Sequence, residues 1–160
     1  MKKLLLLPII FLFISCGITQ STPVKIDPIS KSFQVDKEKD ELYVSANNWM
    51  AENFVSSKSV IQFTDKPSGV VTGRYLLKQG YTYQNYAYLE SEGGSVYAII
   101  KIQVKDGAAK ITLDPEEFRE LDGAYINEKF KFTRETATNQ INDLTISFEE
   151  YLKTDNSNNW

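Results

Sequence analysis

The sequence predicts an α+β domain: a curved antiparallel sheet of about five or six strands, backed by helices on one face and completed by a C-terminal helix. Three observations lead to this prediction. Segments of alternating apolar and polar residues fill the middle of the chain, and turn signals separate them. Segments on either side of this region show the periodicity of amphipathic helices. A strong hairpin signal, Asp106-Gly107, joins two alternating segments.

The chain begins with two lysines and an apolar run over residues 4–14, which is the layout of a secretory signal peptide. The run is shorter than the roughly 18–20 apolar residues that span a bilayer. It ends at "SCG" around Cys16, a stretch that resembles the lipobox of bacterial lipoproteins. The resemblance implies that residues 1–15 are removed and that Cys16 is lipidated. The alternative is a buried cysteine in an uncleaved membrane anchor.

The same resemblance implies a place in the bacterial envelope. Gly17 follows the cysteine, where lipoproteins retained in the inner membrane typically carry aspartate, so an anchor in the outer membrane is expected. The next residues, "ITQST", lack the acidic cluster associated with surface export in some bacteria. A periplasm-facing domain is therefore predicted.

Composition narrows the classes of function. Without Lys2 and Lys3 the chain keeps 16 basic and 21 acidic residues, a net charge of 16 − 21 = −5, which does not favour nucleic-acid binding. The chain has no histidine, so the usual zinc, copper and iron sites and the Ser-His and Cys-His nucleophile pairs are not available. We therefore expect no metal, no cofactor and no catalytic residue, and a protein that is not an enzyme.

Four parts are expected along the chain. After the signal peptide, residues 16–30 are predicted to form the lipidated cysteine and an extended tether, because prolines and polar residues interrupt any periodicity. Residues 31–153 have the length of one domain with its own core. Residues 154–160 form a polar tail.

The segment "KEKDELYVSANNWMAENFVSS" predicts the first helix. Its apolar residues recur on one face: Leu42, Ala46, Trp49, Met50 and Phe54. Asp36 is expected as the N-cap, with Glu38 in the first turn. Trp49 and Phe54 could instead form a ligand clamp, but an apolar stripe at helical spacing favours a place in the core.

Six segments are predicted to be extended and to pair antiparallel: "KSFQVD", "SVIQFTD", "VVTGRYLLKQ", "YTYQNYAYLE", "SVYAIIKIQVK" and "AAKITL". The next stretch, "DPEEF", predicts a short helix with Asp114 as N-cap, Pro115 at the first position and Glu117 at the third. Its adjacent acids leave acid–base catalysis as an alternative. "ATNQINDLTISFEEYLK" predicts the C-terminal helix, with Ile141, Leu144, Phe148 and Leu152 on one face.

Tyrosines are dense in the predicted sheet, and four lie in one segment: Tyr81, Tyr83, Tyr86 and Tyr88. Because side chains alternate across a strand, one pair of these tyrosines is expected on the face that the helices leave open. Exposed tyrosines offer rigid contact area and a hydroxyl, which suits binding of a protein, peptide or glycan. The alternative is that tyrosine simply favours strands.

The stretches "ELYVSANNWMAENF", "VIQFTDKPSGVVTG" and "YAIIKIQVKDG" together resemble domain of unknown function 4468, a family with a fold like that of the TATA-binding protein. The resemblance spans about Ser32 to Leu113. It implies a helix-backed antiparallel sheet in a secreted protein or lipoprotein of Gram-negative bacteria, and it implies no activity. The fold name does not indicate DNA binding, because a fold does not fix a function.

Three functions are compatible with these observations. The first is a lipid-tethered binding or scaffolding module whose open sheet face or sheet edge meets an envelope protein, peptide or glycan. The second is a structural envelope protein that associates with itself. The third is a hydrolase that uses carboxylates, with Asp114 and Glu117, or Glu90 and Glu92, as the candidate pairs.

Overall fold

Five antiparallel strands form the central sheet of the domain, in the order β2-β8-β7-β4-β3. The computed structural model describes residues 23–54, 59–82, 92–120 and 131–154. The sheet strands are β2 (Ile29–Gln34), β3 (Val60–Asp65), β4 (Val70–Lys78), β7 (Val96–Lys105) and β8 (Ala108–Pro115), and the helices are α1 (Lys39–Asn53) and α2 (Arg134–Thr154). Two short ladders lie outside this sheet: β1 (Pro23–Val24) with β9 (Phe118–Arg119), and β5 (Tyr81–Thr82) with β6 (Glu92–Gly93).

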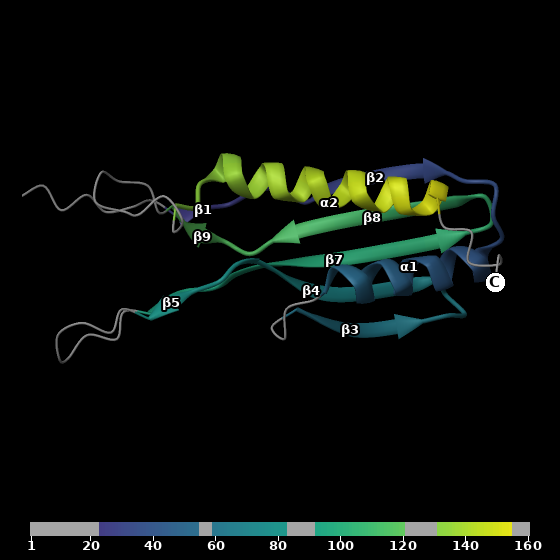
Figure 1. The fold of residues 1–160 in the computed structure, drawn as a ribbon, viewed down its shortest axis with the longest axis horizontal. Coiled ribbons are helices and arrows are strands. Elements are labelled where there is room, and N and C mark those ends of the chain that lie inside the picture. Colours follow the sequence, from purple (N-terminus) through teal and green to yellow (C-terminus); the bar gives the residue numbers. More distant parts are fainter. Residues whose placement is uncertain (1–22, 55–58, 83–91, 121–130, 155–160) are drawn as a thin grey trace, which may run out of the picture.

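Both helices cover the same face of the sheet. In Figure 1, α1 lies along β4 and β7, while α2 lies along β2 and β8. Burial alternates along the strands as this arrangement requires: Ile100 and Ile102 of β7 are fully buried, whereas Lys101 and Gln103 are exposed. The predicted α+β architecture, with a helix-backed antiparallel sheet and a C-terminal helix, is confirmed.

Helix α1 buries the stripe that the sequence predicted. Leu42, Ala46, Trp49 and Met50 are all fully buried. The Trp49 indole packs edge-on against Phe148 of α2, with ring centroids 5.1 Å apart, and its Nε1–H donates to Ser147 Oγ at 3.1 Å. Trp49 is therefore part of the core, and the clamp alternative does not apply to it.

The N-terminus of α1 is capped from a distant part of the chain. Glu38, not Asp36, occupies the N-cap position and makes no side-chain cap. Instead, Asp106 Oδ1 accepts a hydrogen bond from the backbone N–H of Lys39 at 2.8 Å. The expected local cap is wrong, because the Asp106-Gly107 hairpin turn brings a carboxylate to the helix end, where the helix dipole favours it.

Two glycines permit close approaches that another residue would block. A Cβ at Gly73 of β4 would lie 2.4 Å from the Phe54 ring and 2.5 Å from the Met50 methyl group, so the end of α1 sits directly on this strand. Gly69 has a φ of +65° in the turn between β3 and β4. A Cβ there would lie 2.4 Å from the carbonyl oxygen of Val104. The predicted turn thus docks against β7.

Helix α2 begins at Arg134, three residues before the predicted helix, because Thr133 caps it. The backbone N–H of Thr136 donates to Thr133 Oγ1 at 3.2 Å, and the N–H of Thr133 donates back to Thr136 Oγ1 at 2.7 Å. The predicted face is confirmed, since Ile141, Phe148 and Leu152 are fully buried and Leu144 nearly so.

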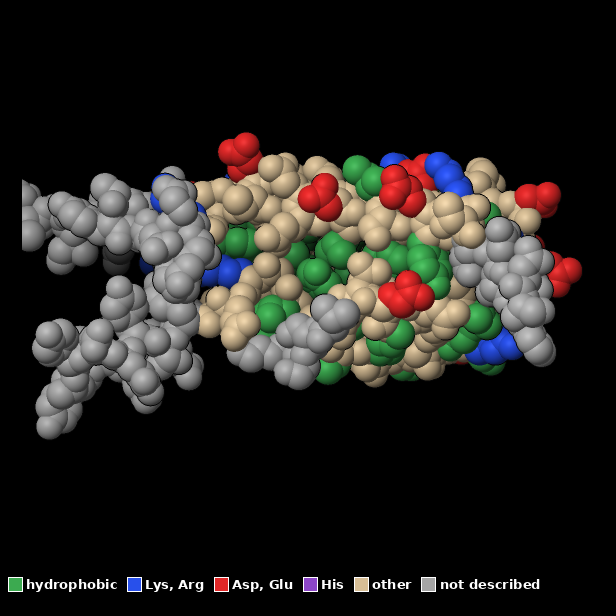
Figure 2. Space-filling view, viewed as in Figure 1, with side chains coloured by type: hydrophobic (Ala, Val, Ile, Leu, Met, Phe, Trp, Pro, Cys, Tyr) green, Lys and Arg blue, Asp and Glu red, His purple; other side chains and the backbone are tan. Residues whose placement is uncertain are grey.

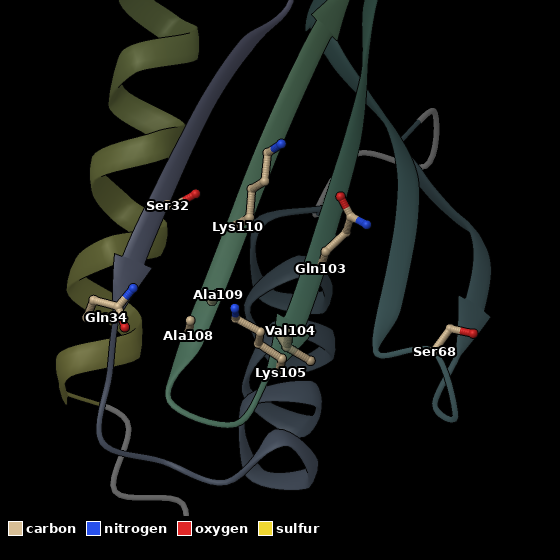
Figure 3. A pocket seen from close by; sticks show the side chains of 9 residues that line it. All are labelled: Ser32, Gln34, Ser68, Gln103, Val104, Lys105, Ala108, Ala109 and Lys110. Atoms are coloured by element: carbon tan, nitrogen blue, oxygen red, sulfur yellow. The ribbon is translucent and has the colours of Figure 1, made fainter.

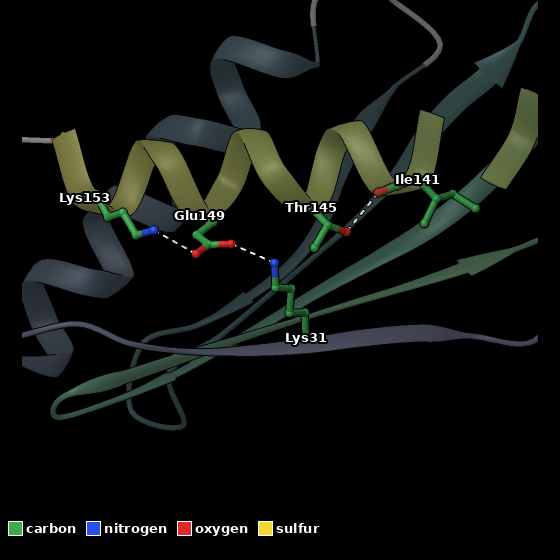
Figure 4. Close-up of polar contacts among 5 residues, drawn as sticks. All are labelled: Lys31, Ile141, Thr145, Glu149 and Lys153. Carbon is green, nitrogen blue, oxygen red and sulfur yellow. Dashed lines mark hydrogen bonds and ion pairs between the residues drawn. The ribbon is translucent and has the colours of Figure 1, made fainter. Parts of the chain in front are cut away.

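A chain of polar contacts joins α2 to the edge strand β2 (Figure 4). Glu149 accepts hydrogen bonds from Lys153 and Lys31, each at 2.7 Å. These bonds lower the pKa of Glu149 to about 2, and the bond from Lys153 has the largest effect. One turn earlier, the buried hydroxyl of Thr145 donates to the carbonyl of Ile141 at 2.8 Å, which satisfies it inside the core.

The predicted "DPEEF" helix is absent, and this part of the chain is extended. Asp114 pairs with Ile99 and Pro115 pairs with Ala98, so β8 continues through the proline, and Phe118 already belongs to β9. A residue before proline prefers extended conformations, which suits an N-cap and a strand alike, so the sequence around Asp114 does not by itself decide between them. The capping pattern is a local signal, and the pairing of β8 with β7 determines the structure here instead.

Two segments differ from the expected strands and tether. The segment "YTYQNYAYLE", expected as a strand of the same sheet, is described only at Tyr81 and Thr82. These residues form β5, which pairs with β6 in a separate ladder, while β7 pairs with β4 and β8 (Figure 1). Residues 23–30, expected in the tether, are part of the fold: Val24 and Ile26 are buried. Their alternating apolar side chains pack against the core.

The signal segment and Cys16 lie outside the described residues, as does the tail from residue 155. In the part of the chain that is described, neither helix is long and apolar enough to cross a membrane.

Candidate binding face

One face of the five-stranded sheet is covered by neither α1 nor α2, the two helices of the described residues, and is here called the open face. Strand register assigns its side chains, since directly paired residues point to the same side of a sheet. Its members are Ser30, Ser32 and Gln34 of β2, Ala108, Lys110, Thr112 and Asp114 of β8, Tyr97, Ile99, Lys101, Gln103 and Lys105 of β7, Val70, Thr72, Arg74 and Leu76 of β4, and Val60, Phe63 and Asp65 of β3.

A hollow of about 390 Å³ lies at the end of the open face nearest the β7–β8 turn (Figure 3). We call it the basic hollow. Its lining comes from β2, β7, β8 and the β3–β4 turn: Ser32, Gln34, Ser68, Gln103, Val104, Lys105, Ala108, Ala109 and Lys110. Its volume lies within the range of small-molecule sites.

The hairpin register explains why these side chains meet. Lys105 pairs with Ala108, and Gln103 pairs with Lys110 across the two-residue turn. On the other side of β8, Ala108 pairs with Gln34 of β2. The short Ala108 side chain thus stands between two long ones, which leaves the depression.

Sequence reasoning missed this site, although a signal for it was present. A two-residue Asp-Gly turn fixes the hairpin register, so it predicts that Gln103 faces Lys110. The contribution of β2 could not be read in this way, because no short turn connects β2 to β8 and their register depends on tertiary packing.

The lysines of the open face differ from most lysines elsewhere in the domain. Lys31, Lys37, Lys66 and Lys153 each form an ion pair with a carboxylate. By contrast, among the described residues no hydrogen bond or ion pair engages the exposed ammonium groups of Lys101, Lys105 and Lys110.

At the opposite end of the open face, the positive charge of Arg74 is paired with the carboxylate of Glu116. Arg74 lies over the Tyr97 ring, with its guanidinium carbon 3.5 Å from the ring centroid. Its Nη2 also donates to Glu116 Oε1 at 2.9 Å, and its Nε to the same oxygen at 3.1 Å. This arginine is held by a ring and a carboxylate, so it is not available to a ligand in the way the three lysines are.

The edge strand β3 carries an apolar strip. Phe63 is 55% exposed, Val60 46% and Ile61 39%. Phe63 and Val60 pair with Thr72 and Arg74, so they lie on the open face. Edge strands commonly carry charged residues or prolines that discourage pairing with another chain, and β3 has only Asp65, at its end.

The tyrosines that the sequence singled out are not brought together on the open face. Tyr83, Tyr86 and Tyr88 lie outside the described residues, and Tyr81 belongs to β5, outside the five-stranded sheet. Two further tyrosines belong to the five-stranded sheet, and Tyr97 of β7 is on the open face. Tyr75 is on the covered face, where burial raises the pKa of its hydroxyl.

The candidate carboxylate pairs do not form a site in the described part of the chain. Asp114 and Glu117 are both exposed, Glu90 lies outside the described residues, and only the backbone of Glu92 is described. A hollow of about 370 Å³ near β9 is lined by Glu117 and by two basic residues, Lys78 and Arg119. Within the same described ranges, no group of three or more metal-ligating side chains comes together.

A further hollow, of about 350 Å³, lies on the covered side between the helices. Figure 2 shows apolar side chains in a band between them. The hollow is lined by Asn53, Tyr75, Leu77, Gln140, Asp143, Leu144 and Ser147. It is an opening above the core, whereas the basic hollow lies on the bare side of the sheet.

The architecture is that of a two-layer α+β domain with one bare sheet face. The chain belongs to the family described as a domain of unknown function (DUF4468) with TBP-like fold, whose model matches residues 32–118. No curated protein matches the chain.

The crystal structures that are similar to this chain include the following two. A DUF4468 family protein from Bacteroides ovatus is 19% identical, covering 76% of this chain and 85% of that one, with a TM-score of 0.45. A TBP-like protein from Parabacteroides distasonis is 11% identical, covering 79% of this chain and 92% of that one, with a TM-score of 0.54. At these identities the second likeness supports the fold alone.

Proposed function

We propose that the protein is a lipid-anchored, non-catalytic binding module of the bacterial envelope and that it meets its partner with the open face. The observation that carries the proposal is the basic hollow, which polar side chains from four chain segments line, on the side of the sheet that neither described helix covers. Small-molecule sites are concave and place a few polar groups where they can orient a ligand, and the hollow meets both conditions.

The anchor in this proposal is Cys16, lipidated after removal of residues 1–15 and inserted in the outer membrane, with the domain facing the periplasm. The "SCG" stretch after an apolar run supports it. Each buried methylene of an acyl chain contributes about 0.8 kcal/mol, so several chains would hold the protein firmly. Replacement of Cys16 by Ser should leave an unprocessed or soluble protein, and unchanged mature mass and membrane association would contradict the anchor.

Site-specific photo-crosslinking in intact cells tests the binding face. A photoreactive residue at position 103, inside the basic hollow, is expected to capture a discrete partner. The matched control is position 146 on α2, where Ile146 is 48% exposed on the other side of the domain. Capture from position 146 with none from position 103 would refute the proposed face.

The tyrosine-rich segment is a further contact in the proposal. Double replacement of Tyr81 and Tyr83 by Ser, and separately of Tyr86 and Tyr88, is expected to lower partner capture for one pair and stability for the other. If both double variants keep the partner and the fold, these tyrosines act as strand formers alone.

A second candidate function, self-association, is favoured by the edge strand β3. Its exposed Val60, Ile61 and Phe63 would become buried if two copies paired edge to edge. Sedimentation of the full chain in detergent, compared with a Phe63→Lys variant, tests this. A wild-type dimer that the variant loses supports self-association, and a concentration-independent monomer refutes it.

A further inference from the structure

The charge of the basic hollow limits which ligands it can take. Lys105 and Lys110 contribute two ammonium groups, and none of the described residues that line the hollow carries a carboxylate. Lys101 lies one pleat further along the same face of β7, opposite Thr112. This local positive charge stands within a protein whose total charge is negative, so it is a feature of this face and not of the whole surface.

The nearest acidic groups have partners already. Asp65 lies in the same cross-strand row as Gln103, through Val70. It accepts a hydrogen bond from the backbone N–H of Ser68 at 3.2 Å, and bonds from the hydroxyl and N–H of Ser68 lower its pKa. Asp106 follows Lys105 in the chain, but its carboxylate caps α1. Among the described residues, neither carboxylate forms an ion pair with the lysines of the hollow.

The remaining lining favours oxygen-rich ligands. Gln34 and Gln103 offer amide groups, and Ser32 offers a hydroxyl, so the hollow can donate to and accept from hydroxyl groups. None of the described lining residues is aromatic, so these residues offer a neutral sugar no stacking surface. The apolar part of the lining is small, since it consists of Val104, Ala108 and Ala109. A purely apolar ligand would gain little there.

We propose that the basic hollow binds a small oxyanion ligand, one that carries a carboxylate or phosphate group with hydroxyls beside it. Lys105 and Lys110 bind the anion from two adjacent strands, and Gln34 and Gln103 bind the hydroxyls. This inference rests on the proposed function, since it names the ligand class of the same face.

Titration calorimetry with the full chain, purified in detergent at low salt, tests the ligand class. Three probes share one sugar ring: glucuronate, glucose 6-phosphate and glucose. We expect both anions to bind and glucose not to bind, with affinities that fall as salt is added. A preference of one anion over the other identifies carboxylate or phosphate as the source. Equal binding of glucose, or no binding of either anion, would overturn the proposal.

Paired variants test the place of binding. Lys105→Gln with Lys110→Gln should weaken anion binding by about five- to tenfold, because each exposed charge pair contributes modestly. Lys66→Gln with Lys153→Gln removes the same charge elsewhere and should leave binding unchanged. Ala108→Leu fills the hollow without altering charge and should abolish binding. If the two double variants behave alike, the site is wrong.

The two proposals fail in different ways. If position 103 captures a partner in cells while neither anion binds, the ligand class is wrong and the binding face stands. If the anions bind in the hollow and position 103 captures nothing, the proposed ligand class is supported and the proposed binding of a macromolecular partner is refuted.

Discussion

Along β7, the side chains towards the helices are Val96, Ala98, Ile100, Ile102 and Val104, all buried. The alternate side chains on the open face include Lys101, Gln103 and Lys105, all exposed. One strand therefore serves two purposes. Its apolar side supplies the free energy of folding by removing side chains from water, and its polar side is left for contacts with something else.

Substitutions on the two faces should therefore affect different properties of the protein. Changes on the covered face should alter stability first, because every side chain there has packed neighbours. Changes in the basic hollow should alter binding and leave stability nearly unchanged, because its lysines make no ion pair that folding depends on within the described residues, where Lys31, Lys37, Lys66 and Lys153 make theirs.

The largest expected effect is on the covered face. Trp49→Ala should lower the free energy of unfolding by about 3–5 kcal/mol, because it removes a fully buried indole from between the helices. The control is Phe63→Ala on the open side, a large aromatic that is 55% exposed, where a change within about 0.5 kcal/mol is expected. Urea unfolding measures both, and equal losses would break the comparison.

A pair of aspartates gives a smaller contrast. Asp106→Ala should lower the free energy of unfolding by about 0.5–2 kcal/mol, since the N-terminus of α1 loses its cap, and Asp106→Asn should restore much of the loss. Asp114→Ala, on the open face, should change it by less than about 0.5 kcal/mol. A cap role for Asp106 is refuted if the Ala and Asn variants unfold at the same urea concentration.

The smallest effect concerns the ion pairs at the margin of the covered face. Hydrogen bonds from Lys153 and Lys31 lower the pKa of Glu149 to about 2, below its value in the unfolded chain. Its contribution to stability is therefore present above about pH 4.5 and is lost as the pH falls towards 2. The effect is small because the carboxylate is in contact with solvent.

Thermal unfolding between pH 5 and pH 2 should show this difference. The melting temperature of Glu149→Gln should fall less with acid than that of the wild type, and added salt should reduce the gap. Glu150→Gln, one residue along α2 on its exposed side, is the control and should follow the wild type. Parallel curves for all three proteins would show that the contacts of Glu149 contribute nothing measurable.

Much of the fold could be predicted because its signals are periodic. The stripes of α1 and α2 and the alternation of β7 identify the buried residues directly, and Asp106-Gly107 identifies the central hairpin. The errors arose where a local signal competed with tertiary pairing. Asp114 was predicted to start a helix, but it pairs with Ile99 in the sheet. Asp36 was predicted to cap α1, but the distant Asp106 accepts the hydrogen bond at the helix N-terminus.

The site was harder to predict than the fold. Tyrosine density pointed to residues 81–88, whereas the described open face depends on lysines and glutamines that are unremarkable in the sequence. Alternation places Lys101, Gln103 and Lys105 on one side of β7, and the hairpin adds Lys110. Gln34 and Ser68 come from segments far away in the chain, and only the folded register brings them to the same hollow.

Amine-reactive footprinting can show whether the open face is the binding face. The labelling rates of individual lysines would be measured in the isolated envelope fraction and in the purified protein. If the open face is the binding face, Lys101, Lys105 and Lys110 should be labelled more slowly in the envelope, while Lys66 and Lys153 should react equally in both samples. Equal labelling of all five lysines in both samples, or protection of Lys66 and Lys153 alone, would contradict the account.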